Sequence, residues 1–463
     1  MIRSRFIGDR AFYRKTLRVM TPVLVQNVIT NFVSLLDNIM VGRVGTEPMS
    51  GVAIVNQLIF VFNLFVFGAV AGAGVFLAQY YGKGDEEGVR WSFRAKLYIS
   101  LIVCALSAAI FLLWGPQLIS LFLHEGEEAL DLAATLDYGE AYLRVMLLQI
   151  LPFAVMQVYA SSLRETGETV LPMTAGLIAV GVNLVFNYVL IYGKFGAPAL
   201  GVVGAAVATL LARCTECLIV VLWPHLHTDR IPFLKGVYRD LRVPLPLVKR
   251  LAVVGTPLIF NEVLWALGTT VLNQCYSLRG LEVISALNIS STVSNLFNCA
   301  FLAMGTTVSI LIGQLLGAGE LERAVDEDRK LLAFSVALCA AVGLVLAALS
   351  PLFPRIYNTT QAVKDLATRF LLVCACMMPF NSFLHTCYFT LRTGGRAAIT
   401  FLYDEAFIWG LSVPVAFLLS RFTAMPILPL FLCVQAVELV KCILGWYLVK
   451  KRVWVRNLVE KDL

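Results

Sequence analysis

The sequence predicts an all-α polytopic membrane protein, with 12 transmembrane helices in two six-helix lobes related by a pseudo-two-fold axis along the membrane normal. Of its 463 residues, 59% are hydrophobic and only 14% are charged, whereas about a quarter of the residues of a soluble protein are charged. The mean hydropathy is +0.80. Apolar runs of about 20 residues, the length that crosses a bilayer, recur along the whole chain. The two halves of the chain also resemble each other in sequence.

The longest polar connection separates six apolar runs from the next six. We therefore expect an N-lobe at 1–224, a cytoplasmic linker at 225–249 and a C-lobe at 250–463 that ends in a basic cytoplasmic tail. The first 18 residues are basic and polar and lead into a full-length span, so we expect no signal peptide. The expected spans are 17–41, 50–77, 94–114, 138–160, 170–193, 200–224, 250–277, 284–313, 331–350, 368–391, 398–420 and 426–449.

The distribution of lysine and arginine predicts the orientation in the membrane. Most of these 37 residues lie in the N-terminal arm, the linker, the tail and the connections that would share their side, whereas the connection 115–140 has none. Cytoplasmic loops carry the excess of basic residues. We therefore expect a multi-pass protein of the plasma (inner) membrane with both termini in the cytoplasm.

A shift of 235 residues aligns the two halves without a gap over the first two spans of each. Each half has an even number of spans, so the repeats share one orientation and are parallel, as in one class of transporter architecture. The paired glycines that follow the second and eighth spans are expected to end those helices. The matched residues include Thr21 and Thr256, Pro22 and Pro257, Gln79 and Gln314, Gly82 and Gly317, and Gly84 and Gly319.

Two carboxylates lie within expected spans. Glu262 is near the middle of the apolar stretch 251–276, and Asp37 is near the outer end of the first span. An ionised group at the bilayer centre costs about 3 kcal/mol or more unless it is paired, protonated or hydrated. The spans offer few cations near the depth of Glu262, so we expect a functional site there, with a structural ion pair as the alternative. For Asp37 the alternative is simple hydration at the membrane interface.

The two acids do not occupy equivalent positions in the repeats. The shift of 235 pairs Glu262 with Asn27 and Asp37 with Leu272. We therefore expect two lobe sites of different chemistry. Two further pairs of opposite charge, Arg213 with Glu216 and Glu438 with Lys441, are three residues apart and are expected to be local ion pairs.

Polar side chains share helical faces with these acids, and such faces within a membrane look into a bundle or a wet cavity. In the N-lobe, Asn183 and Asn187 lie one turn apart in the fifth span, and Thr209 lies in the sixth. Their oxygens could bind a hard cation beside Asp37, or could hydrogen-bond between helices. The polar residues expected to line a substrate cavity are Asn27, Ser34, Trp265, Thr269, Asn273, Asn288, Asn295, Asn381, His385 and Tyr388, although for His385 a helix–helix contact is the favoured reading.

Several segments resemble motifs of the MATE (multidrug and toxic compound extrusion) transporters, within the multidrug/oligosaccharidyl-lipid/polysaccharide exporter superfamily. They are 36–45 (LDNIMVGRVG), 79–84, 183–193, 204–209 and 391–395, and the resemblance extends over essentially the whole chain. It implies a secondary active antiporter that exports cationic amphiphilic drugs or metabolites in exchange for Na⁺ or H⁺, by alternating access of two lobes. The resemblance implies ion coupling at Asp37, Glu262, Asn183, Asn187 and Thr209, with Asp37, Asn183, Asn187 and Thr209 as the ligands if the ion is Na⁺.

The chain departs from the family pattern at two positions. Asn187 and Asn381 stand where some members have an aspartate, so the choice between Na⁺ and H⁺ stays open. The alternative function is a flippase for a lipid-linked oligosaccharide precursor, which the acidic rather than basic spans disfavour. A membrane-embedded enzyme is less favoured still, because no catalytic motif is present. We expect no cofactor, no nucleic-acid partner, contact with membrane lipid and a monomer.

Overall fold

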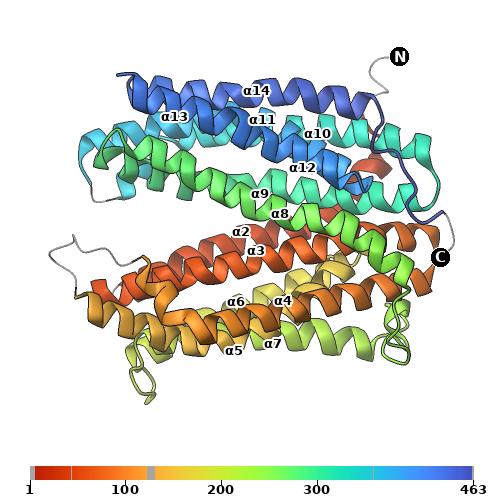
Figure 1. Ribbon diagram of the computed structural model, residues 1–463, viewed down its shortest axis with the longest axis horizontal. Coiled ribbons are helices and arrows are strands. Elements are labelled where there is room, and N and C mark those ends of the chain that lie inside the picture. The colour runs from red at the N-terminus through yellow and green to blue at the C-terminus, as the bar shows by residue number, and fades with distance from the viewer. Residues whose placement is uncertain (1–5, 43, 123–130, 358, 461–463) are drawn as a thin grey trace. The chain divides into compact units, whose positions relative to one another are not determined.

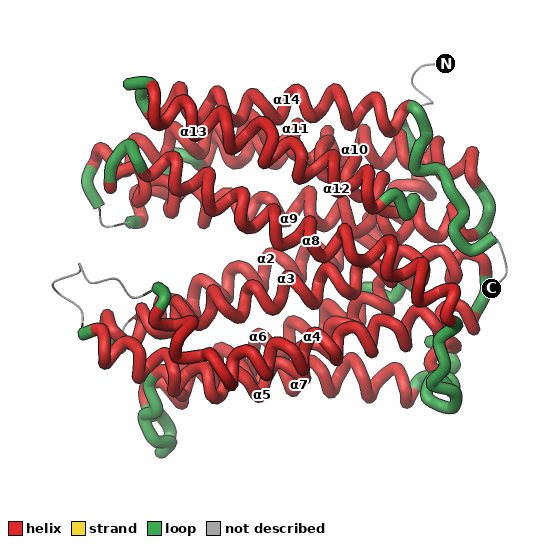
Figure 2. The backbone as a smooth tube through the Cα atoms, viewed as in Figure 1, coloured by secondary structure: helices red, strands yellow, loops and turns green. Residues whose placement is uncertain are grey.

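The computed structural model describes residues 6–42, 44–122, 131–357 and 359–460, and the described residues contain helices and loops but no strand (Figure 2). Eleven helical segments are long and apolar enough to cross a membrane. The first long helix, α2, adds 33 residues. The prediction of twelve helical spans is thus confirmed. Figure 1 labels the helices: α2 (Arg10–Gly42), α3 (Thr46–Lys83), α4 (Glu86–Ser120), α5 (Leu132–Glu165), α6 (Val170–Tyr192), α7 (Val202–Leu226), α8 (Leu245–Ser277), α9 (Leu281–Gly317), α10 (Leu321–Leu349), α11 (Gln361–Thr393), α12 (Ala397–Phe407), α13 (Val413–Phe422) and α14 (Ile427–Lys450).

The eleventh span is not one continuous α-helix. A π-helical segment, η3 (Ile408–Ser412), connects α12 to α13. The other helices are longer than the apolar runs that predicted them; α4, for instance, begins at Glu86 rather than at residue 94. Charged residues such as Glu86, Glu87 and Arg90 continue that helix beyond the apolar part, because hydropathy marks the membrane-spanning portion and not the helix end.

The described residues form two compact units. Unit 1 comprises Met1–Val28, Ala78–Asp85 and Arg250–Leu463, and unit 2 comprises Ile29–Leu77 and Glu86–Lys249. The boundary between 249 and 250 coincides with the expected start of the C-lobe. The start of α2 and the end of α3 belong to the unit that holds the second half of the chain.

In unit 1, α11 is the central helix and packs against α9, α10, α12 and α14. One core cluster gathers buried residues of α9, α10 and α11 with the start of α2 and with Trp454 of the tail; it includes Met304, Leu311 and Leu391. The ends of α3 and α9 cross closely at the predicted glycines. A Cβ atom on Gly82 would overlap the carbonyl oxygen of Gln314, and one on Gly317 would overlap that of Gln79.

These glycines end their helices as predicted. The helix α3 ends at Lys83 and α9 at Gly317. Gly84 and Gly319 then adopt φ angles of +78° and +77°, a conformation that glycine reaches without strain. The crossing and the turns recur at the 235-residue shift, so the structure bears out the internal repeat at its most constrained point.

In unit 2, α5 packs against α4 and α7, and α6 packs against α7. The segment after α7 docks onto α4 through three residues one turn apart. Arg90 Nε donates to Phe233 O at 3.1 Å, Arg94 Nε to Val237 O at 2.8 Å, and Tyr98 Oη to Leu241 O at 2.8 Å. The expected linker is therefore an ordered part of unit 2.

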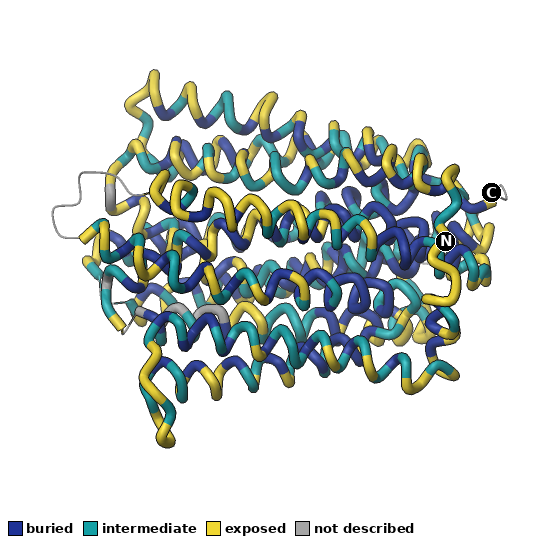
Figure 3. The backbone as a smooth tube through the Cα atoms, turned by 60° about the horizontal axis from the view of Figure 1, so that its bottom comes forward, coloured by how far each residue is buried: buried dark blue, intermediate teal, exposed yellow. Residues whose placement is uncertain are grey.

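Burial follows the same order in both halves. The second and fourth spans of each half, α3 and α5 or α9 and α11, have at least half of their apolar windows buried, whereas the third spans, α4 and α10, have 17% and 28% buried. Exposed positions recur along the length of the helices (Figure 3), as expected of apolar helices that face lipid. The shared burial pattern supports two repeats of one architecture.

Candidate ion and substrate sites

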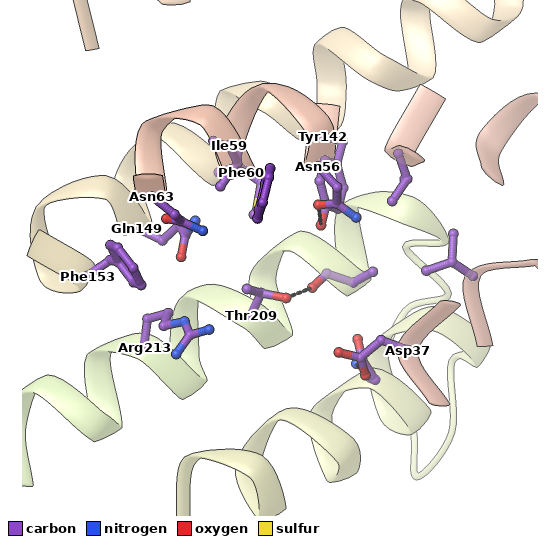
Figure 4. A pocket seen from close by; sticks show the side chains of 15 residues that line it. Asp37, Asn56, Ile59, Phe60, Asn63, Tyr142, Gln149, Phe153, Thr209 and Arg213 are labelled. Carbon is purple, nitrogen blue, oxygen red and sulfur yellow. Dashed lines mark hydrogen bonds between the residues drawn. The ribbon is translucent and has the colours of Figure 1, made fainter. Parts of the chain in front are cut away.

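The acid of the first span lies in the wall of a cavity within unit 2. This cavity has a volume of about 360 Å³ and brings Asp37 of α2 together with side chains of α3, α5, α6 and α7 (Figure 4). Tyr192 Oη donates to Met40 O at 2.9 Å and so ties α6 to the end of α2. The lining residues are Asp37, Val41, Val52, Asn56, Ile59, Phe60, Asn63, Tyr142, Met146, Gln149, Phe153, Asn187, Ala205, Thr209 and Arg213.

Two asparagine amides surround the Asp37 carboxylate. Asn187 Nδ2 donates to Asp37 Oδ1 at 2.7 Å. In the amide orientation that satisfies donors and acceptors, Asn183 Nδ2 lies 2.9 and 3.0 Å from the two carboxylate oxygens. Thr209 Oγ1 is 3.4 Å from the Asn183 amide and donates to Ala205 O. The structure therefore places together the four residues that the sequence suggested as a cation site.

The donor set fits either ion. Sodium needs several oxygens around a charge, and the described residues leave Asn187 Oδ1 buried without a hydrogen-bond partner. A bound sodium ion would require the amides to turn their oxygens toward it. A proton requires only one of the Asp37 oxygens. In the arrangement described, the amide N–H groups take the place that a cation would occupy beside Asp37.

The rest of this cavity is mixed aromatic and polar. Phe60, Phe153 and Tyr142 contribute rings, and Tyr142 Oη donates to Asn56 Oδ1 at 3.2 Å. Arg213 lies across the cavity, but its guanidinium pairs with Glu216 at 2.8 Å, which confirms the predicted local ion pair. Asp37 is thus the carboxylate of the cavity that lacks a paired cation among the described residues.

In unit 1, the structure corrects our expectation for Glu262. Arg392 Nη1 lies 3.7 Å from Glu262 Oε1, with side chains 13% and 26% exposed. The sequence assigned Arg392 to a cytoplasmic turn, but it lies in the last turn of α11 and reaches α8. Glu262 therefore has a cationic partner, and the structural reading of this acid gains weight.

Polar contacts extend from this pair to a second one. Arg392 Nη1 donates to Tyr388 Oη at 3.5 Å, and Asn261 Nδ2 donates to Tyr388 Oη and to Asp404 Oδ2, each at 3.2 Å. Lys441 Nζ is 2.5 Å from Asp404 Oδ1 but 4.0 Å from Glu438, the partner expected from sequence. We name these residues, from Glu262 through Asp404 to Lys441, the charged network.

Sequence reasoning missed Asp404 and its neighbour Glu405. Both lie inside the expected span 398–420, so the signal that singled out Glu262, an acid within an apolar run, was present for them too. Their position close to the start of the span made them resemble ordinary helix-end charges. Only the fold shows that α12 brings them against α8, α11 and α14.

The structure scatters the remaining candidates for the substrate cavity. Tyr388 joins the charged network, and the His385 ring stacks on Phe301 at 4.5 Å, as a helix–helix contact predicts. Thr269 Oγ1 donates to its own helix at Ala266 O. Asn27 and Asn381 are partly exposed; Trp265, Asn273, Asn288 and Asn295 are exposed; and the side chain of Ser34 lies outside the described residues.

The comparisons with known proteins agree with this architecture. The family model named MatE matches residues 22–189 and 257–418, more than half of the chain. The two matched segments begin 235 residues apart, the offset of the internal repeat. The matches therefore confirm the family resemblance of the sequence motifs.

Relatives cover nearly the same length. The probable multidrug resistance protein YoeA of Bacillus subtilis is 25% identical over 456 residues, which cover 97% of this chain and 96% of that protein. The multidrug resistance protein NorM of Vibrio cholerae is 27% identical over 419 residues, 87% of this chain and 86% of that protein.

Solved structures share the fold. An outward-facing multidrug resistance MATE family transporter of the MOP superfamily has a TM-score of 0.85 at 19% identity and 97% coverage of both chains. A crystal structure of the Vibrio cholerae MATE transporter VcmN has a TM-score of 0.86 at 18% identity, covering 97% of this chain and 98% of that one. The described chain is a multi-pass membrane protein and a transporter rather than an enzyme, and it belongs to the MatE family.

Proposed function

We propose that this chain is a secondary active antiporter that exports cationic amphiphilic compounds in exchange for Na⁺ or H⁺. The observation that carries the proposal is the Asp37 carboxylate, held by amide donors in the wall of a partly aromatic cavity. The names of the relatives, multidrug resistance proteins, support export of several compounds. The alternating access of two lobes is part of the proposal.

The cavity suits a flat organic cation. A carboxylate without a paired cation attracts positive charge, and aromatic faces such as those of Phe60, Phe153 and Tyr142 add cation–π and apolar contact. The one arginine in the wall is already engaged by Glu216. An anionic headgroup, as on a lipid-linked oligosaccharide precursor, would therefore meet more repulsion than attraction.

Exchange follows from competition for one negative charge. A coupling ion that neutralises Asp37 removes the attraction for a cationic substrate, and a bound substrate excludes the ion. Such a ligand drives transport only through different affinities for two conformations. We expect Asn183, Asn187 and Thr209 to turn oxygens toward Na⁺, or Asp37 alone to take up H⁺.

The remaining features of the proposal concern the cellular setting. The excess of lysine and arginine in the connections that share a side with the termini supports cytoplasmic termini and a plasma (inner) membrane location. We propose a monomer that needs no cofactor and contacts only its substrates, its coupling ion and membrane lipid.

Transport by the full chain in proteoliposomes tests the proposal. We expect ethidium export under a sodium gradient, under a proton gradient alone, or under both, which names the ion. Asp37→Asn and Glu262→Gln should each reduce export about tenfold or more, equivalent to about 1.4 kcal/mol. The exposed acids Asp137 and Glu282 supply the controls Asp137→Asn and Glu282→Gln, which should transport normally. Full export by both test variants would remove this mechanism.

A further inference from the structure

Unit 1 contains a buried acid that the transport mechanism above does not use. Glu405 of α12 is 3% exposed. Within the described residues, neither of its carboxylate oxygens accepts a hydrogen bond. The nearby indole of Trp409 donates instead to Leu264 O at 3.2 Å. A buried carboxylate without a donor or counter-ion is far more stable as the neutral acid.

The surroundings of Glu405 are rich in charge. Its neighbour Asp404 is ionised and paired with Lys441 at 2.5 Å. The charges of Asp404, Lys441 and Glu262 all act on Glu405. The titratable or charged groups on the helices packed around α12 are Glu262 of α8, His385, Tyr388 and Arg392 of α11, and Glu438 and Lys441 of α14.

The charges in this cluster do not balance. Four carboxylates, those of Glu262, Asp404, Glu405 and Glu438, face two basic side chains, Arg392 and Lys441. If every acid were ionised, two negative charges would lack a partner in an environment where each is costly. The cluster must therefore hold protons or take up other cations, and Glu405 is the member with both oxygens unengaged.

The backbone next to Glu405 is also unusual. The π-helical segment η3 begins three residues after it, at Ile408. Short π-helical segments inside α-helices occur frequently at functional sites. The Ser412 hydroxyl at the end of η3 is buried without a partner among the described residues. The segment that carries Glu405 is thus irregular where a uniform apolar span would be regular.

We propose that Glu405 is a proton-binding residue of unit 1, neutral in this conformation, which releases its proton when a cationic substrate binds beside the charged network. This inference rests on the proposed export of organic cations. The O–H bond of the Glu405 carboxyl group breaks, the proton passes to water, and the positive charge of the substrate balances the new carboxylate. The Asp404–Lys441 pair acts as a positioning pair that keeps Asp404 ionised.

Proton release on substrate binding tests the inference. The purified full chain, in detergent and weak buffer with a pH indicator, is titrated with ethidium. We expect the wild-type chain to release about one proton per bound ethidium from this site. Glu405→Gln, which mimics the neutral acid, should still bind ethidium but release about one proton fewer. Glu405→Asp should restore release, and the exposed control Glu282→Gln should behave as wild type.

Each outcome decides between the readings. If Glu405→Gln releases as many protons as wild type, or if wild type binds ethidium without proton release, Glu405 is only a structural neutral acid and the inference is overturned while efflux stands. If wild type neither binds nor exports ethidium, the proposed function fails first. If Glu405→Gln does not fold, Glu405→Asp still decides, since a proton carrier should shift the pH dependence of release and a packing residue should not.

Discussion

The acids of the two units have different partners. Asp37 is held by the neutral amides of Asn183 and Asn187 and keeps its net charge, whereas Glu262 is offset by Arg392. At an equivalent cost of burial, the first arrangement leaves an attraction for a cation and the second largely satisfies it. The prediction of two sites of different chemistry thus has a structural basis in the residues that surround each acid.

The neutral residue at position 187 sets the charge of the Asp37 site. Asn187→Asp would place a second carboxylate where an amide now donates to Asp37 Oδ1 at 2.7 Å. Two carboxylates at this distance cannot both stay ionised without a cation between them. We expect the variant to bind Na⁺ about tenfold more tightly, or to retain one more proton, measured as sodium-dependent protection against thermal unfolding. Unchanged protection at every sodium concentration would show that residue 187 does not contribute to an ion site.

At the scale of elements, the closest contact in the described chain joins the ends of two equivalent helices. Gly82 of α3 and Gly317 of α9 each pack against the other helix's backbone at Gln314 and Gln79. Only a residue without a Cβ atom allows this approach. The sequence repeat located these glycines, but it assigned them only to the ends of their helices.

Gly317→Ala tests the crossing. Its Cβ atom would overlap the backbone oxygen of Gln79, which cannot move as a side chain can, so we expect a loss of about 2 kcal/mol or more. The control is Gly181→Ala in α6, where an added Cβ atom meets nothing within 4 Å; it should be neutral or stabilising by up to about 1 kcal/mol. Thermal unfolding of the detergent-solubilised chain measures both. Equal stability of the two variants would contradict the close crossing.

Hydrophobic runs predicted the spans because burial in lipid requires apolar side chains along the whole crossing. They could not predict that α4 begins at Glu86 or that η3 interrupts the eleventh span, since both depend on hydrogen bonds outside or within an already apolar segment. The grouping of Asp37 with Asn183, Asn187 and Thr209 came from resemblance and helical periodicity. The pairs Glu262–Arg392 and Asp404–Lys441 needed the packing of distant helices, which one-dimensional periodicity does not contain.

At the scale of the whole molecule, both halves end in a segment that folds back. The segment after α7 docks onto α4 of unit 2, and the tail after α14 docks within unit 1. There, Leu458 N donates to Gln79 Oε1 at 2.7 Å, and Lys83 Nζ donates to Val459 O at 2.9 Å. The tail therefore fixes the end of α3 within unit 1, although α3 belongs to the first half of the sequence.

Trp454 anchors this tail. Its side chain is 1% exposed, lies in the core cluster with Leu311 and Leu391, and donates from Nε1 to Val449 O at 3.2 Å. Trp454→Ala should cost about 3–5 kcal/mol, as for other buried aromatic residues. Because the tail would then hold Gln79 and Lys83 less firmly, hydrogen exchange of Ala78–Asp85 should also become faster.

The control for the tail is the exposed tryptophan of the helix that precedes it. Trp446 is 54% exposed and only receives the Lys450 ammonium over its ring, so Trp446→Ala should change stability by about 0.5 kcal/mol or less. Thermal unfolding and hydrogen-exchange mass spectrometry measure both variants. Lower stability of Trp454→Ala without faster exchange at Ala78–Asp85 would limit the tail to a packing role. Faster exchange in that segment alone would instead identify the tail as the element that couples the end of α3 to the second half of the chain.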